Sequence, residues 1–154
     1  SHCERDCSGK ACGDDGCGGI CGECGAVESC QDFQCLCSDD FGYEPNDQCS
    51  KATQLEQGSY SDLGLCTDDE DWYKIFLPAG STLQASILFT HNVGDLDLYL
   101  YKQGDCLTPK DSSASSNDNE GVVFSTETSA PYLIRIAGFT KQVSNSYTLS
   151  LTIK

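Results

Sequence analysis

The cysteines of this chain are concentrated at its N-terminal end. Nine of the twelve lie within the first 37 residues, and only Cys49, Cys66 and Cys106 follow. Few other apolar residues occur in this segment, too few to offset an ordering cost of about 1.5 kcal/mol per residue. Cysteines at such density are typical of an oxidising, extracellular compartment, where disulfides replace a large core. We therefore expect a disulfide-stapled module over residues 1–40 in a secreted or cell-surface protein.

The odd number of N-terminal cysteines constrains their pairing. If all twelve are bonded, at least one disulfide joins this module to the rest of the chain, and the two remaining downstream cysteines pair with each other. We prefer Cys49–Cys66 with Cys37–Cys106, and the second solution is Cys37–Cys49 with Cys66–Cys106. The C-x-x-C spacing in this segment also allows a zinc site, which the surplus of cysteines disfavours.

From residue 54 onward, apolar residues recur with a period of two, the pattern of half-buried strands. The repeats at 73–77, 83–89, 96–100, 122–124, 132–136 and 147–153 predict strands with one buried face each. Polar, turn-forming segments separate them. One turn of helix is expected near residues 46–52, capped by Asn46 or Asp47. The pattern predicts an all-β fold over residues 41–154, an antiparallel sandwich.

The charge of the chain excludes some partners. It has 24 acidic and 9 basic residues, for a formal net charge of −15. Nucleic acid requires a basic surface and is therefore excluded. No apolar stretch reaches the roughly 20 residues of a membrane span. Divalent cations, or a partner with basic patches, fit the composition better. Separately, we expect the protein to be a monomer.

Two acidic stretches suggest a cation site. They are "EPND" at residues 44–47 and "TDDED" at residues 67–71. Short oxygen-bearing side chains on irregular backbone suit calcium, which takes 6–8 oxygen ligands. Asp68 and Asp71 are three residues apart, so in a turn they converge on one point, whereas Asp69 and Glu70 point to water. A purely solvated acidic surface is the alternative.

Five motifs, in order, resemble those of bacterial pre-peptidase C-terminal domains, a superfamily that includes the collagen-binding domains of clostridial collagenases. They are "EPND", "DEDWY" (69–73), "DLDLYLY" (95–101), "YLIRI" (132–136) and "SYTLSL" (146–151). The resemblance implies a jelly-roll-like β-sandwich and a non-catalytic role beside secreted hydrolases, often proteases. It also implies calcium where the linker meets the sandwich. The implied ligands are Glu44, Asn46, Asp47, Asp68 and Asp71, while a further acid of the calcium-binding members is replaced here by Gly42.

The resemblance also points to a candidate binding face. If the strands neighbour each other as in the related domains, Tyr99, Tyr101, Arg135 and Phe139 form an amphipathic platform. Aromatic residues and arginine often anchor interfaces, although strand surfaces also carry aromatics for packing alone. Ala137 and Phe139 stand where the collagenase domains present tyrosines, so collagen is not assigned as the ligand.

No catalytic set is expected. The two histidines are His2 and His91, and His91 is expected to be solvent-exposed in a turn. Asp95 and Asp97 are expected on a solvated strand face and not as a glycosidase-like carboxylate pair. The motif C-G-x-D-G-C-G-G-x-C-G-x-C at 12–24 is similar to a cysteine-rich module of bacterial secreted proteins, for which a spacer or recognition role is expected.

Two functions remain. In the first, the chain is an accessory module that docks a parent hydrolase to an extracellular polymer, protein or polysaccharide, or contacts the parent enzyme domain. In the second, it is a structural or processing segment that aids secretion or folding and has no ligand.

Overall fold

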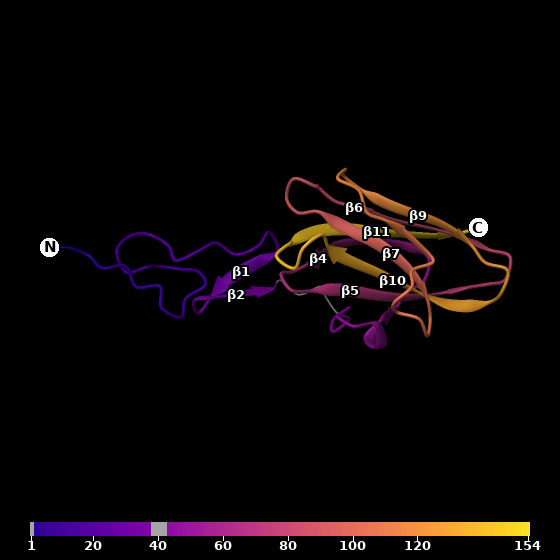
Figure 1. Cartoon of the computed structure of the whole chain (residues 1–154), viewed down its shortest axis with the longest axis horizontal. Helices are drawn as coiled ribbons and strands as arrows, with labels where there is room; N and C mark the ends of the chain where they lie inside the picture. The colour runs from indigo at the N-terminus through magenta and orange to yellow at the C-terminus, as the bar shows by residue number, and fades with distance from the viewer. Residues whose placement is uncertain (1, 38–42) are drawn as a thin grey trace.

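The computed structural model describes residues 2–37 and 43–154, which form a small N-terminal module and a larger sandwich (Figure 1). The module contains one antiparallel hairpin, β1 (Glu28–Gln31) with β2 (Gln34–Cys37). Its two-residue turn places Asp32 and Phe33 at positive φ, the conformation that matches the twist of paired strands. Four disulfides hold the module: Cys3–Cys17, Cys7–Cys21, Cys12–Cys30 and Cys24–Cys35. The expected disulfide-stapled module is confirmed, and the domain boundary near residue 40 lies outside the described residues.

The sandwich consists of two sheets packed face to face (Figure 1). One sheet has the order β3-β5-β10-β7-β8 and the other β4-β11-β6-β9. The strands are β3 (Thr53–Gln54), β4 (Gly58–Leu65), β5 (Glu70–Leu77), β6 (Thr82–Leu88), β7 (Leu96–Lys102), β8 (Asp111–Ser113), β9 (Glu120–Ser125), β10 (Ala130–Gly138) and β11 (Asn145–Ile153). Apart from the short parallel contact of β3 with β5, the pairs are antiparallel. The expected all-β sandwich is confirmed.

The core lies between the sheets and follows the period-two pattern. On β7, Leu96, Leu98 and Leu100 are fully buried, because alternate residues of a strand point to the same face. The apolar positions expected to face inward on β5, β6, β10 and β11 also enter this core, with Ile153 only partly buried at its edge. Strand β4 was not predicted: its first five residues are exposed except for half-buried Tyr60, and only its last three residues are buried.

Of the two remaining disulfides, Cys37–Cys66 joins the module to the sandwich and Cys49–Cys106 lies within the sandwich. The inference that one bridge ties the module to the sandwich is confirmed, as is the pairing of the two remaining cysteines. Both specific pairings expected from the sequence are wrong. Cys66 directly follows β4, whereas Cys49 lies beside the loop after β7 that carries Cys106. Every cysteine is paired, so the zinc interpretation is also wrong.

The module contacts the end of the sandwich through its first strand. The Glu28 carboxylate accepts hydrogen bonds from the N–H groups of Thr67, at 2.7 Å, and Gly25, at 2.9 Å. The Val27 N–H donates to Ser144 Oγ at 3.3 Å. Burial alone would raise the pKa of Glu28. The hydrogen bonds from Thr67 and Gly25 outweigh this effect and lower the pKa below its ordinary value. Together with Cys37–Cys66, they fix the loop before β5.

The helical turn expected near residue 50 is a single 3-10 turn, η1 (Cys49–Lys51). Its first flanking residue is Gln48, whose side chain forms no cap hydrogen bond, so the expected capping by Asn46 or Asp47 is wrong. Within the described ranges, no helix has the length and hydrophobicity needed to cross a membrane.

Candidate functional site

The candidate metal site lies where the linker before β3 meets the loop between β4 and β5. The Asn46 carbonyl accepts a hydrogen bond from the Trp72 N–H at 2.9 Å, which aligns the linker with β5. On the other side, the Asp68 N–H donates to the Lys141 carbonyl at 2.7 Å. Both acidic stretches are therefore held by backbone contacts, and their side chains share a cleft of about 300 Å³ that the Cys37–Cys66 disulfide also lines.

Three carboxylates converge in this cleft. One oxygen each from Glu44, Asp47 and Asp69 lies within 4.8 Å of the others. Burial raises the pKa of Glu44 to about 7, and the nearby charges of Asp69 and Asp47 add to the effect. Burial, together with the charge of Asp47, also raises the pKa of Asp69. Without a cation, it is therefore costly to ionise all three carboxyl groups of the cluster, because their negative charges repel each other.

Asn46 lies beside the cluster and pairs with one of its acids. Its side chain is fully buried, and its backbone N–H donates to Glu44 Oε2 at 2.9 Å. In the amide orientation that satisfies both groups, the Asn46 side-chain nitrogen donates to Glu44 Oε2 at 2.9 Å. The donor set contains only oxygens, which suits calcium.

The structure corrects the expected roles of the acids after β4. Asp68 is exposed, has φ of 61° and lines the rim of the cleft, and within the described chain its carboxylate belongs to no three-acid cluster. Asp71 is fully buried and accepts a hydrogen bond from the Tyr147 hydroxyl. Asp69, expected to point to water, is the acid of this loop whose carboxylate lies close to Glu44 and Asp47. The sequence argument assumed a turn through residue 71, but β5 begins at Glu70, and in an extended strand residues three apart point to opposite faces.

The predicted position of Glu70 is also wrong. Its carboxylate forms a bidentate ion pair with Arg135 on the neighbouring strand and accepts a hydrogen bond from Trp72 Nε1 at 3.1 Å. Gly42, where the related domains carry a further acid, lies outside the described residues.

The structure brings together only part of the expected ligand face. Arg135 on β10 lies opposite Tyr99 on β7, and its guanidinium lies 5.2 Å from the Tyr99 ring centroid and 5.8 Å from that of Trp72. Phe139 is 72% exposed and lines one cleft with Arg135. Tyr101 is only 4% exposed, because it packs against Trp72 with ring centroids 5.3 Å apart. Tyr101 is therefore part of a second small core and not of an exposed platform.

Asp97, expected on a solvated face, is also buried. It is 6% exposed, and its pKa is raised to about 6 by burial and by the neighbouring charge of Asp95. The Tyr99 hydroxyl donates to Asp97 Oδ2 at 3.4 Å. Asp95 itself lies 3.1 Å from Nδ1 of His91. Sequence alternation identified the strand face correctly, but it could not show that side chains of neighbouring strands cover this face.

Comparisons with known proteins concern the fold. A scan of protein-family models finds none that matches the chain, and a search of curated proteins finds no match. Among solved structures, the chain is similar to the pre-peptidase C-terminal domain of a collagenase from Bacillus anthracis, at 12% identity and a TM-score of 0.54. The match covers 66% of this chain and 94% of that one.

A second similar structure is PliG from Aeromonas hydrophila, a periplasmic inhibitor of g-type lysozyme. It is 13% identical, with a TM-score of 0.53, and the match covers 67% of this chain and 97% of that one. At such identities the likeness concerns architecture alone, because one fold serves many functions. The sandwich therefore has the fold of a pre-peptidase C-terminal domain, as its motifs predicted.

Proposed function

We propose that this chain is a non-catalytic, calcium-stabilised accessory module of a secreted bacterial hydrolase, in the first place a protease, which it docks to a polymeric substrate. The observation that carries the proposal is the convergence of carboxylates from the linker and the β4–β5 loop. Glu44, Asn46, Asp47 and Asp69 are the residues that would hold the ion. When bound, calcium supplies a positive centre that neutralises these acids and ties the linker to the sandwich.

The protein groups around the cleft prepare this role. The Cys37–Cys66 disulfide and the Glu28–Thr67 hydrogen bond hold both sides of the cleft, so little ordering is needed when a cation binds. Six disulfides fit a secreted protein. One similar structure is a domain of a collagenase and the other is periplasmic, which supports an accessory role beside an exported enzyme.

The surface for docking is the outer face of β7 and β10, where Tyr99, Arg135 and Phe139 are accessible. Phe139 is its most exposed member, and large exposed aromatics commonly anchor interfaces. The test is retention of the protein on insoluble collagen, chitin, cellulose and bacterial cell-wall material. We expect retention on one of them, and loss of retention in the double variant Tyr99→Ala, Phe139→Ala.

Phe76→Ala is the matched control, because Phe76 is an exposed aromatic on β5, 51% accessible, that pairs with Pro131 at the end of β10 far from Phe139. It should be retained like the wild type. If the wild type is retained on none of the four materials in the presence of calcium, the docking function is wrong. A structural or processing segment without a ligand is then the better account.

A further inference from the structure

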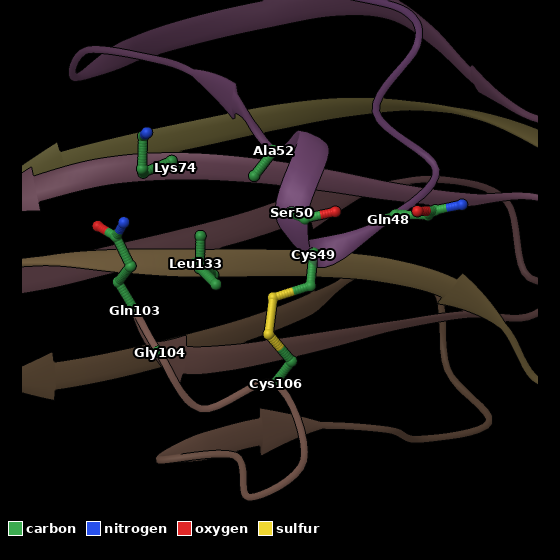
Figure 2. Close-up of a pocket in the computed structure, with 9 residues that line it drawn as sticks. All are labelled: Gln48, Cys49, Ser50, Ala52, Lys74, Gln103, Gly104, Cys106 and Leu133. Atoms are coloured by element: carbon green, nitrogen blue, oxygen red, sulfur yellow. A yellow bond between two sulfur atoms is a disulfide. The ribbon is translucent and has the colours of Figure 1, made fainter.

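A cavity separate from the acidic cleft lies on the outer face of the five-stranded sheet, against β5 and β10. Its volume is about 560 Å³, within the range of small-ligand pockets. Figure 2 shows Leu133 in the middle, Lys74 and Gln103 to one side, and the Cys49–Cys106 disulfide to the other. Lys74 and Leu133 lie on strands, and the disulfide joins the 3-10 turn on one side to the loop after β7 on the other.

The floor of the cavity is apolar. Leu133 packs with Trp72 and Tyr101 in the small core on this side of the sheet, and Ala52 and the disulfide pack against the same core. Leu133 is only 3% exposed, so the apolar surface open to a ligand comes from Ala52 and the disulfide, which are half-buried. An apolar side chain placed here would lie against carbon and sulfur on several sides, which favours its transfer from water.

The other end of the cavity carries hydrogen-bond donors and a positive charge. Lys74 is half-buried and, within the described parts of the chain, forms no ion pair. Gln103 contributes an amide beside it, and Gly104 follows in a turn with φ of 94°. Together these groups offer an anion a positive charge and hydrogen-bond donors at one end of the cavity.

We propose that this cavity binds the C-terminal residue of a peptide chain, with its apolar side chain against Ala52 and the Cys49–Cys106 disulfide and its α-carboxylate on Lys74 and Gln103. The ligand carries a carboxylate next to an apolar group. The amides of Gln103 and Gln48 can also form hydrogen bonds with its peptide groups. Such C-termini are the ends that a protease creates, so the biological use of the site rests on the proposed accessory function.

The single tryptophan of the chain, Trp72, lies in the core behind the cavity, and its fluorescence reports on binding. The probe is acetyl-Gly-Gly-Leu with a free carboxylate, compared with the same peptide as an amide, in calcium buffer. Nitrogen-15 NMR spectra of the same titration locate the site through the signals of Leu133 and the Gln103 amide. We expect saturable binding of the acid and about tenfold weaker binding of the amide, the loss typical of a charge-assisted hydrogen bond.

Lys74→Gln should weaken the acid about tenfold and leave the amide unchanged, because it removes only the partner of the carboxylate. Lys154→Gln is the matched control: it removes the same charge at an exposed terminal position and should bind like the wild type. No binding of the acid at millimolar concentration, or equal binding of acid and amide, overturns the proposal. Octanoate binding as tightly as the peptide would identify a fatty-acid site and overturn the peptide assignment.

These soluble peptides test the cavity apart from docking to insoluble material. If the peptides bind but no polymer retains the protein, the docking function fails and the cavity assignment stands. If a polymer retains the protein but the peptides do not bind, the cavity assignment fails and the docking function stands.

Discussion

The replacement Asp69→Asn tests the metal site most directly. Oxygens of Glu44, Asp47 and Asp69 lie within 4.8 Å of one another. Two unit charges at this distance repel by about 1 kcal/mol in water and about 3 kcal/mol at an effective dielectric constant of 20. The acids are exposed or half-buried, so we use the lower value. The replacement removes two of the three repulsive pairs, or about 2 kcal/mol.

Without calcium, at pH 8, Asp69→Asn should therefore melt higher than the wild type, by about 4–8 °C for a chain of this size. With calcium the order should reverse. Calcium at a hundred times its Kd stabilises the wild type by about 2.7 kcal/mol, whereas the variant lacks a ligand carboxylate and should gain little. The assay is differential scanning calorimetry in EDTA and in calcium.

Asp68→Asn is the matched control, because it makes the same change one residue earlier. Asp68 is exposed, and asparagine tolerates its positive φ. It should melt like the wild type under both conditions. If Asp68→Asn loses the calcium response and Asp69→Asn keeps it, the site assigned from the structure is wrong. If the wild type itself does not respond to calcium, the metal proposal is wrong.

Four further predictions concern the cleft and the core beside it. Burial and two neighbouring aspartates raise the pKa of Glu44 to about 7, so calcium must displace a proton at lower pH; calorimetric titration should show weaker binding at pH 6 than at pH 8, and a pH-independent Kd would contradict this. The same raised pKa favours the calcium-free fold at low pH, so its stability should fall as pH rises from about 4.5 to 7. Replacing Cys37 and Cys66 together by serine should cost about 2–4 kcal/mol in urea unfolding and weaken calcium binding, and an unchanged Kd would show that the bridge does not shape the cleft. Tyr147→Phe removes the hydroxyl that donates to buried Asp71 and should destabilise by about 2 kcal/mol, whereas a neutral result would show that Asp71 is satisfied without it.

The sandwich was predictable because its signal is local. Alternating residues such as Leu96, Leu98 and Leu100 reveal a strand and its buried face without knowledge of the partner strand. Strand β8 gave no such signal, because its three residues are polar and form a ladder only against β7. The acidic stretches were recognisable as the candidate metal site by composition, but the choice among the acids depended on where β5 begins. A start at Glu70 turns Asp69 into the cleft and sends Asp71 into the core.

The sequence by itself determined the disulfide-rich module, the all-β sandwich and the junction where acids gather, because cysteine density, period-two alternation and charge runs are properties of neighbouring residues. Only the tertiary structure decided which cysteines pair, which aspartate faces Glu44 and Asp47, and that Tyr101 and Asp97 are covered. It also revealed the cavity between Lys74 and the Cys49–Cys106 disulfide. Each of these depends on distances between residues far apart in the chain, which are fixed by how the strands pair and pack.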